Sequence, residues 1–534
     1  MSTTAVASLR VLVSDPLHEA GAALLKQNAD VSVDTKLRLP QPDLVRAIRE
    51  YDALIVRSET QVTAEVLEAG QRLRVVGRAG VGVDNIDLDA ATRRGIAVVN
   101  APTGNTVAAA EHTVALLLAM ARNIPQSDAS LKKGEWRRSQ FMGVEVRNKV
   151  LGVIGLGRVG SEVARRAIGL QMRVLAFDPF ITAEVASRLG VELAPMERVV
   201  AESDFLTLHT PLTAGTKGIL GAAELSTMKK GSRILNVARG GLVDEDALLN
   251  AVESGHLAGA ALDVYTEEPP KPGPLFQNPK IITVPHLGAS TVEAQASVAE
   301  EVVQQVMAVL RGQPARFTVN APFVPTEDLQ ALGPYMQVAT TLGRIAVQLV
   351  EGQLRSVSLT YDGELAQHNT AILKAASLIG LLQPVSDDRV NLVNAGVLAQ
   401  QRGLRVEEHS EGPRGPQQNL LTLEVNASGG MVTLSGTVAR GEVHIVRVRD
   451  LWMDMVPDSP YLLFVEHRDR PGMIGAVGTI TGRHDVNISF MEVGRRETRG
   501  RATMVLGLDD AAPPPVLEEL RAIPEISGVK LVRL

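Results

Sequence analysis

The hydrophobic positions of the first 100 residues fall into short runs separated by helical patterns. The apolar runs predict strands at residues 9–13, 31–33, 53–56, 73–76 and 96–99. Helical periodicity lies between them, for example at residues 20–26 and 43–50. Strands that alternate with helices at this spacing predict a doubly wound parallel sheet. Asp15 and Pro16, rather than a glycine-rich turn, follow the first strand, so this unit is not expected to bind a dinucleotide.

A second alternating set follows a long helical stretch at residues 106–122. Its predicted strands are residues 150–154, 173–177, 205–208, 233–236, 259–262 and 281–283. Six parallel strands with crossovers suit a complete dinucleotide-binding fold. An amphipathic helix at residues 291–311 then carries the chain back toward the first unit, which predicts that the first domain is discontinuous.

The pattern changes after a proline-rich stretch at residues 313–325, which is interpreted as a linker. Residues 326–456 begin with helices at 332–350 and 371–382 and end with strands, so they predict an α+β domain. The predicted strands are residues 420–425, 431–438 and 443–448. Residues 461–534 follow the order βαββαβ of a ferredoxin-like module. The predicted elements of this module are residues 461–466, 474–483, 487–493, 502–508, 515–522 and 529–532.

The first two strands of the second set enclose the sequence Gly155-Leu-Gly157-Arg-Val-Gly160. Gly155 permits a tight turn, Gly157 lets a pyrophosphate approach the backbone, and Gly160 lets the following helix pack closely. The helix start offers N–H groups to the phosphates. Asp178 ends the second strand and is placed to bind the ribose 2′-hydroxyl, which favours NAD over NADP. Arg158 is expected to face the pyrophosphate or solvent. A glycine motif alone also occurs in ordinary strand–turn–helix units, but these flanks argue against that alternative.

Three chemically suitable residues each follow a predicted strand of the second set: Arg239, Glu268 and His286. The carboxyl ends of parallel strands are where open α/β sheets bind ligands. A histidine suits removal of an alcohol proton at neutral pH, and a neighbouring carboxylate orients it. An arginine grips a substrate carboxylate with two hydrogen bonds. Taken singly, each residue also has a structural interpretation, as a hydrogen-bonding histidine, a solvated loop charge or a helix cap.

The runs at residues 151–178, 236–246, 262–270 and 286–290 resemble the D-2-hydroxyacid dehydrogenases. The resemblance spans residues 9–311 and implies that Arg239, Glu268 and His286 are catalytic. It implies NAD as cofactor, bound by Gly155, Gly157, Arg158, Val159, Gly160, Asp178, Thr210, Ala238, Arg239, Asp263, His286 and Gly288. It implies a substrate cleft formed by Arg57, Ser58, Arg78, Gly80, Asn105 and Arg138.

Residues 73–87, 134–144 and 467–472 resemble one branch of that family, the long phosphoglycerate dehydrogenases. The resemblance implies NAD-dependent oxidation of 3-phosphoglycerate, the first step of the phosphorylated route to L-serine. The cleft arginines, with Arg137 and Arg138 among them, fit a phosphorylated substrate, although these two also fit a solvated loop. An alternative in the same family is a glyoxylate or hydroxypyruvate reductase, and one in another class is a nonenzymatic dinucleotide-sensing corepressor.

The same resemblance divides the chain into four expected domains: residues 1–100 with 284–312 bind substrate, 101–283 bind NAD, 326–456 form an intervening regulatory domain, and 461–534 form an ACT domain. ACT domains pair edge to edge and bind effectors at the seam. The resemblance therefore implies a homo-oligomer, a tetramer or dimer, with L-serine held by His467, Asp469 and Asn487. The apolar helix around residues 114–121 is either core or part of a dimer interface.

Composition excludes several other classes of protein and agrees with a dehydrogenase. The 534 residues are 45% hydrophobic and 21% charged, with a net charge of -6, so no broad basic surface for nucleic acid is expected. The chain has no cysteine, which excludes disulfides and thiolate metal sites and fits a cytoplasmic enzyme. No metal site is expected. The first ten residues do not resemble a signal peptide, and residues 114–121 are too few to span a membrane.

Overall fold

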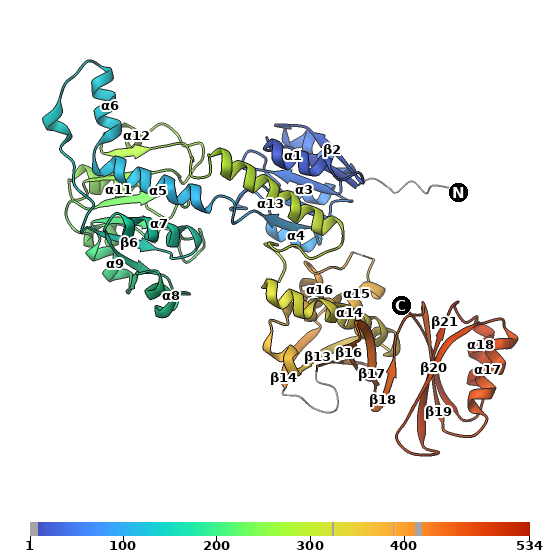
Figure 1. Ribbon diagram of the computed structural model, residues 1–534. Coiled ribbons are helices and arrows are strands. Elements are labelled where there is room, and N and C mark those ends of the chain that lie inside the picture. Colours follow the sequence, from blue (N-terminus) through green and yellow to red (C-terminus); the bar gives the residue numbers. More distant parts are fainter. Residues whose placement is uncertain (1–8, 323–324, 388, 412–418) are drawn as a thin grey trace.

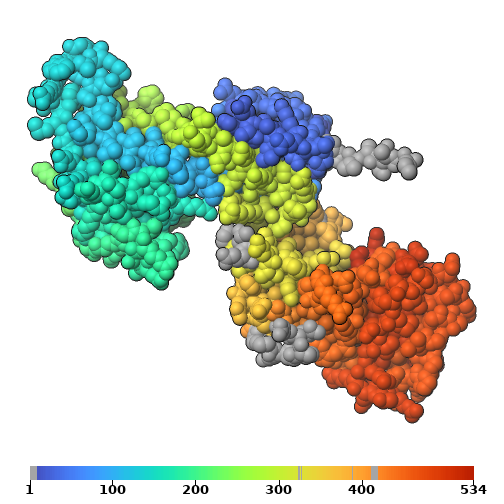
Figure 2. Space-filling view, in the orientation of Figure 1, coloured from blue at the N-terminus to red at the C-terminus, as the bar shows by residue number. Residues whose placement is uncertain are grey.

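The computed structural model describes residues 9–322, 325–387, 389–411 and 419–534. These residues form four sheets with helices packed on them (Figure 1). In Figure 2 the teal second part lies at the left, the blue first part beside it, and the yellow and red C-terminal parts at the lower right. Two sheets are wholly parallel, the third is mixed and the fourth is antiparallel, which confirms the predicted fold class.

The first sheet has the strand order β2-β1-β3-β4-β5. Its strands are β1 (Leu9–Val13), β2 (Val31–Thr35), β3 (Ala53–Val56), β4 (Val75–Arg78) and β5 (Ala97–Asn100). Its helices are α1 (Glu19–Lys26), α2 (Gln41–Ala47), η1 (Ile48–Glu50), α3 (Ala64–Ala69) and α4 (Leu88–Arg93). β4 and β5 begin later than the hydrophobic pattern predicts. Leu73 is buried in a turn that its N–H closes on Gly70, and Ile96 is buried where its N–H closes the end of α4.

The second sheet has the order β12-β11-β10-β9-β6-β7-β8. The six predicted strands have the predicted bounds: β6 (Val150–Ile154), β7 (Arg173–Phe177), β9 (Phe205–Leu208), β10 (Arg233–Asn236), β11 (Gly259–Leu262) and β12 (Ile281–Thr283). The pattern missed β8 (Glu192–Leu193), because two residues leave no periodicity. The helices are α5 (Thr106–Ala121), α6 (Ile124–Lys132), η2 (Arg138–Phe141), α7 (Arg158–Gly169), α8 (Ala183–Arg188), α9 (Met196–Glu202), α10 (Ala222–Thr227), α11 (Glu245–Glu253) and α12 (Pro274–Gln277).

Helix α13 (Val292–Leu310) returns the chain to the first sheet, as predicted (Figure 1). Its residues Val302 and Val306 are fully buried in the core that also contains the strands β1, β3 and β4. Gly77 on β4 makes this approach possible, because a Cβ there would lie 2.5 Å from a methyl group of Val306. The two N-terminal sheets are therefore joined by helices that cross between them, whereas the exact domain ranges stay a prediction.

The proline-rich segment after α13 is not a free linker, which corrects the sequence interpretation. Thr318 forms an antiparallel bridge with Val99 on β5, and the Val319 N–H donates to the Val98 carbonyl at 2.7 Å. Phe317 beside this bridge is buried. The prolines at 314, 322 and 325 lie outside residues 316–320, so these five residues keep the N–H groups that strand pairing needs.

The third sheet has the order β14-β13-β15-β16-β17-β18 and packs on α14, α15 and α16. Its elements are α14 (Thr326–Leu349), β13 (Leu354–Asp362), η3 (Gly363–Gln367), α15 (Ala371–Leu382), η4 (Gln383–Val385), α16 (Ala395–Gln401), β14 (Arg405–Glu411), β15 (Leu420–Ala427), β16 (Gly430–Ala439), β17 (Glu442–Val448) and β18 (Leu451–Met455). The sequence missed β13, β14, β18 and α16. β14 reads RVEEHSE, and so polar an edge strand carries no hydrophobic signal.

The last module has the predicted βαββαβ order and the strand order β20-β21-β19-β22. Its elements are β19 (Tyr461–Arg468), α17 (Met473–Arg483), β20 (Ile488–Arg495), β21 (Arg501–Leu508), α18 (Pro514–Arg521) and β22 (Ile526–Arg533). One face of the sheet, including Leu463 and Val465, packs under α17 and α18. The other face, including Leu462 and Phe464, joins the core of the third sheet. The two C-terminal modules therefore share a hydrophobic interface.

Within the described part of the chain, no single helix is long and apolar enough to cross a membrane. Helices α5 and α6 pass the length and composition test only as a pair, and they are bent by 63° where they meet. Half of α5 is buried inside this chain, with Leu116 and Leu117 in the core beside α7.

His209 makes the second sheet sensitive to acid. It follows β9, its ring nitrogen Nε2 lies 3.0 Å from Thr207 Oγ1, and burial lowers its pKa to about 4. The unfolded chain, with a pKa near 6.5, binds this proton more readily. Stability is therefore unaffected above pH 6.5 and falls as the pH drops toward 4, by roughly 3 kcal/mol.

We expect His209→Gln to flatten that part of the pH profile of the unfolding free energy, measured by urea titration between pH 7 and 4. The exposed His409→Gln serves as a control and keeps the wild-type profile. An unchanged slope in His209→Gln would contradict this assignment.

Candidate active site

The glycine turn between β6 and α7 has the shape that a dinucleotide needs. Gly155 has a φ of +92°, which favours glycine, and a Cβ on Gly160 would lie 2.0 Å from the Gly155 carbonyl oxygen. Gly157 precedes the first residue of α7, and a Cβ there would meet no atom within 4 Å. No side chain caps the helix start. The first N–H groups of α7 therefore face open space in which an anion can bind.

Two further residues near this turn fit a nucleotide. Asp178 follows β7, and its carboxylate accepts from the N–H groups of Leu156 and Phe180, both at 2.8 Å. These bonds fix the carboxylate beside the turn and leave lone pairs for a ribose hydroxyl. The hydroxyl oxygen of Thr210 is buried without a hydrogen-bond partner, as is common where a ligand completes a site. The donor set and the open turn together fit NAD.

Arg158 is exposed, in line with the expectation that it faces the pyrophosphate or solvent, but its side chain also makes contacts that the sequence did not indicate. Its guanidinium donates to the Pro102 carbonyl at 3.3 Å and lies 5.4 Å from the ring centre of Phe317. The side chain therefore reaches toward the first sheet, and only the backbone N–H of this residue remains at the start of α7. Sequence spacing could not show this, because Phe317 is 159 positions away.

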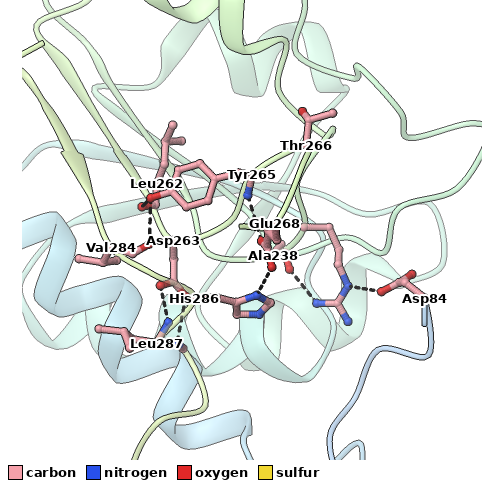
Figure 3. Close-up of polar contacts among 12 residues, drawn as sticks. Asp84, Ala238, Leu262, Asp263, Tyr265, Thr266, Glu268, Val284, His286 and Leu287 are labelled. Atoms are coloured by element: carbon pink, nitrogen blue, oxygen red, sulfur yellow. Dashed lines mark hydrogen bonds and ion pairs between the residues drawn. The ribbon is translucent and has the colours of Figure 1, made fainter. Parts of the chain in front are cut away.

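His286 and Glu268 form a close pair beyond the ends of β12 and β11. His286 Nδ1 lies 2.7 Å from Glu268 Oε2, and the Tyr265 N–H donates to the other Glu268 oxygen at 3.1 Å (Figure 3). Burial alone would raise the pKa of Glu268. The hydrogen bond and charge of His286, the Tyr265 N–H and the charge of Arg239 together outweigh burial, so the pKa of Glu268 lies below its usual value. Glu268 is therefore ionised at neutral pH and orients the imidazole.

Asp263 holds the loop that carries His286. This carboxylate is fully buried after β11 and accepts from the N–H of Leu287 at 2.6 Å and of Gly288 at 2.8 Å (Figure 3). His286 itself has a φ of +53°, a region that is uncommon for residues other than glycine. His112 on α5, which the sequence analysis missed, lies 3.3 Å from the same carboxylate. Asp263 and Gly288 are thus part of the support for His286.

Arg239 follows β10 in a turn shaped by Asn236. The buried Asn236 side chain donates to the Arg239 carbonyl at 2.9 Å and accepts from the Ala238 N–H at 3.1 Å. The Arg239 guanidinium donates to the Ala238 carbonyl at 2.7 Å and lies 3.5 Å from Asp84 of the first sheet's domain. The sequence analysis did not single out Asp84, which comes from a segment about 150 residues earlier. Arg239 therefore lies at the junction of the two N-terminal domains.

Three arginines gather at this junction. Burial lowers the pKa of Arg78 to about 10, and the positive charges of Arg239 and Arg57 act in the same direction, with Asp84 and Asp15 opposing them. Arg78 Nε is buried without a hydrogen-bond partner. Asp84 and Asp15 therefore compensate the positive charge of the cleft only in part, and an anion would stabilise it further.

The other predicted substrate-binding residues, Arg138 apart, lie in three places: in the Arg57 loop, beside Arg78 and at the start of α5. Asp15 anchors the Arg57 loop by accepting from its N–H at 2.6 Å, and Ser58 beside it is exposed. Gly80 lies against Arg78, because a Cβ there would stand 1.5 Å from Nη1. Asn105 begins α5, and its side-chain oxygen is buried without a partner.

Arg138 is not part of this cluster within the described chain. It lies on η2 after α6, is exposed, and has no ion pair or hydrogen bond to the cleft. The neighbouring Arg137 pairs with Glu135 at 3.0 Å. In Figure 1, α6 and the loop that follows it stand out from the body of the second sheet.

The structure does not bring the three effector candidates together within one chain. Asp469 precedes α17 and accepts from Arg495 at 2.6 Å, which lowers its pKa. Asn487 follows α17 and donates to Asp509 at 2.6 Å. His467 is buried, and its Nε2 has no partner. Since Asp469 and Asn487 flank opposite ends of an 11-residue helix, a shared ligand requires a second module.

Comparison with known families agrees with this geometry. Residues 114–288 match the model for "D-isomer specific 2-hydroxyacid dehydrogenase, NAD binding domain", residues 331–449 match "D-3-phosphoglycerate dehydrogenase intervening domain", and residues 461–525 match "ACT domain". The fold and the site define an NAD-dependent dehydrogenase of D-2-hydroxy acids.

The chain belongs to the D-3-phosphoglycerate dehydrogenase family. It is 42% identical to the D-3-phosphoglycerate dehydrogenase of Archaeoglobus fulgidus, over 98% of this chain and 100% of that one. It is 40% identical to the Bacillus subtilis enzyme of the same name, over 98% and 99%. The similarity therefore includes both C-terminal modules.

Solved structures resemble the catalytic part. A glyoxylate reductase from Paecilomyes thermophila is 29% identical, with a TM-score of 0.54, and the match covers 58% of this chain and 98% of that one. The D-lactate dehydrogenase of Aquifex aeolicus complexed with NAD and lactic acid is 27% identical, with a TM-score of 0.51, over 57% and 96%. That complex supports NAD as the cofactor.

The open turn yields a test of cofactor binding. We expect Gly157→Ala to weaken NAD binding by about tenfold or more, because the methyl group would occupy space beside the helix start. Its melting temperature should not fall, since no protein atom lies near that methyl group.

Gly169→Ala is the matched control, because this glycine also faces open space but at the other end of α7. Calorimetric titration with NAD measures both variants. Equal NAD affinity in the two would contradict the placement of the phosphates.

Proposed function

We propose that this enzyme oxidises D-3-phosphoglycerate to 3-phosphohydroxypyruvate with NAD, the first step of the phosphorylated route to L-serine. The observation that carries the proposal is the cluster of Arg57, Arg78 and Arg239 in the cleft. The substrate bears a carboxylate and a phosphate, so its charge matches three cations better than that of a simple 2-hydroxy acid does. The names and full-length similarity of the relatives support the same substrate.

The catalytic roles follow from the geometry of the His286–Glu268 pair. Ionised Glu268 accepts a hydrogen bond from His286 Nδ1–H, which leaves Nε2 free to remove the proton of the substrate's C2 hydroxyl. Glu268 also stabilises the imidazolium that results. Arg239 binds the carboxylate and fixes the orientation of C2. NAD, when bound, supplies the acceptor for the hydrogen and electron pair that leave C2. The residues at the start of α7, with Asp178 and Thr210, would hold it.

Two alternatives remain separable by assay. A glyoxylate or hydroxypyruvate reductase needs the His286–Glu268 pair, but it needs neither a cluster of three arginines nor the C-terminal modules. A nonenzymatic corepressor needs no close His286–Glu268 contact. NADH consumption with phosphohydroxypyruvate, hydroxypyruvate and glyoxylate distinguishes the three: the proposal requires the highest kcat/KM for phosphohydroxypyruvate.

We expect His286→Ala to lower kcat by about 10²–10⁴-fold while NADH still binds, because the general base is lost. Steady-state kinetics and NADH fluorescence measure the two properties. Glu267→Gln is the control, since this neighbouring carboxylate is exposed and pairs with Lys271. A kcat within a few-fold of wild type in His286→Ala would refute the assignment.

We expect Arg57→Ala to raise the KM for phosphohydroxypyruvate about tenfold or more, because a charge-assisted hydrogen bond of roughly 1.5–3 kcal/mol is lost. The KM for an unphosphorylated 2-keto acid should change much less. Arg49→Ala, an exposed arginine of η1, controls for the loss of net charge. An equal rise for both substrates would count against phosphate recognition.

We propose further that the enzyme is a homo-oligomer, a dimer or tetramer. The sequence left open whether residues 114–121 of α5 are core or part of a dimer interface. Half of α5 is buried inside this chain. Three large apolar side chains in the residues after it are exposed: Leu131, Trp136 and Met142 have exposed fractions of 57%, 81% and 84%. A cluster of this kind is typical of a subunit interface. Light scattering at micromolar concentration measures the molar mass.

A cytoplasmic location is also proposed. It rests on the cysteine-free sequence, which fits a reducing compartment. Cell fractionation with an antibody against the chain tests it.

We propose that two ACT modules bind L-serine between them and that serine restrains the enzyme. ACT modules bind amino-acid effectors, and β20 is an edge strand of the fourth sheet, which suits edge-to-edge pairing. Pairing would bring Asp469 of one module toward Asn487 of another, so that serine contacts both. Inhibition requires that serine prefer one of two states.

We expect Asn487→Ala to raise the serine concentration for half-inhibition about tenfold or more, through lost hydrogen bonds. Asn426→Ala is the control, an exposed asparagine on the third sheet. Activity is measured across a serine titration, with binding measured by calorimetry. Wild-type protein that neither binds nor responds to millimolar serine would leave the module an assembly element.

A further inference from the structure

A cavity of about 450 Å³ lies where the first sheet's domain meets the third sheet's domain. Its walls come from the start of β5, the end of α13, the segment after α13, and the helices α14 and α15. Arg74 precedes β4 and Ala97 begins β5, so the cavity lies at the amino ends of these strands. The catalytic cleft lies at the carboxyl ends, and the two sites are therefore on opposite edges of the sheet.

Among the described residues, the charged side chains that line this cavity are all arginines: Arg74, Arg316 and Arg389. One guanidinium nitrogen of Arg74 donates to the Val309 carbonyl at 3.3 Å, and its Nε is buried without a hydrogen-bond partner. Burial lowers the pKa of Arg389, and the charge of Arg74 lowers it further. The cavity thus concentrates positive charge, and the lining residues that the structure describes include no carboxylate.

The other walls are mainly apolar. Leu329 and Met336 from α14 face Ile372 and Ile379 from α15 across the cavity lining, and Val393 closes it from the loop before α16. Hydrocarbon walls with a few cationic groups are typical of sites for small organic anions. A hydrated inorganic ion would gain nothing from these walls.

The walls are held in place from both domains. Asn391 donates to the Gly95 carbonyl at 2.6 Å, which ties the loop before α16 to the end of α4. Asn320 accepts from the Val98 N–H at 2.8 Å, which ties the segment after α13 to β5. The cavity is therefore bounded by hydrogen-bonded contacts rather than by loose surfaces.

We propose that this cavity binds a small organic anion with an apolar body, whose anionic group is held by Arg74 and Arg389. Such a ligand would contact both domains at once. The site is separate from the catalytic cleft and from the ACT edge, and its existence does not depend on the proposed reaction. The ligand class follows from the lining: a carboxylate, phosphate or sulfonate for the arginines, and a hydrocarbon or aromatic part for α14 and α15.

The test uses the full chain and the fluorescent sulfonate 1-anilinonaphthalene-8-sulfonate, with saturating NAD present to fill the cofactor site. N-phenyl-1-naphthylamine, which has a similar body but no charge, is the comparison probe. Wild-type protein should bind the sulfonate saturably, at one site per chain, and more tightly than the neutral probe. Absence of saturable sulfonate binding would overturn the proposal.

Variants locate the binding. Arg74→Gln with Arg389→Gln should weaken the sulfonate about tenfold or more and leave the neutral probe unchanged. Arg355→Gln, an exposed arginine on β13, removes a charge outside the cavity and should change neither. Ala321→Trp fills the cavity from a segment without regular structure and should abolish binding of both probes. Wild-type sulfonate affinity in either the double variant or Ala321→Trp would overturn the proposal, and unchanged 3-phosphohydroxypyruvate turnover would show that the variants are folded.

Discussion

The catalytic geometry depends on one buried carboxylate, Asp263. It sits after β11 and accepts two backbone N–H groups from the loop after β12, which is the point where the chain leaves the second sheet for α13. Those bonds hold His286 at a positive φ and against Glu268. A backbone conformation of this kind costs of order 1–3 kcal/mol and persists only where its surroundings fix it. The same interaction therefore sets both the catalytic pair and the path by which the chain returns to the first sheet.

Much of this arrangement was predictable from the sequence, because short buried strands and glycine turns are local signals. All six predicted strands of the second sheet have the predicted bounds, and the turn at Gly155 has the predicted shape. Arg239, Glu268 and His286 were predictable as a group, since each follows a strand and parallel strands end at one edge. The resemblance to a known family supplied the substrate and the names of the C-terminal modules.

What the sequence could not give depends on contacts between distant segments. Arg158 turns toward Phe317 and away from the glycine turn, and Asp84 meets Arg239 across the junction of two domains. Polar edge strands such as β14 leave no hydrophobic period, and a two-residue strand such as β8 leaves no period at all. Leu73 and Ile96 show the opposite error, since buried residues in turns resemble strand residues in a hydrophobic pattern. The proposed assembly and the proposed effector site involve a second chain, so the contacts within one chain do not define them.

The pairing of residues 316–320 with β5 has a mechanical consequence. The chain connects the third and fourth sheets to the rest of the enzyme through this segment, which forms backbone hydrogen bonds with the first sheet. A force from the C-terminal half therefore reaches the body that carries Arg57 and Arg78 directly, and it reaches the glycine turn through α5, the Asp263 loop and the contact of Arg158 with Phe317. Strain imposed from that end would therefore act on the proposed substrate site at Arg57 and Arg78 as well as on the glycine turn.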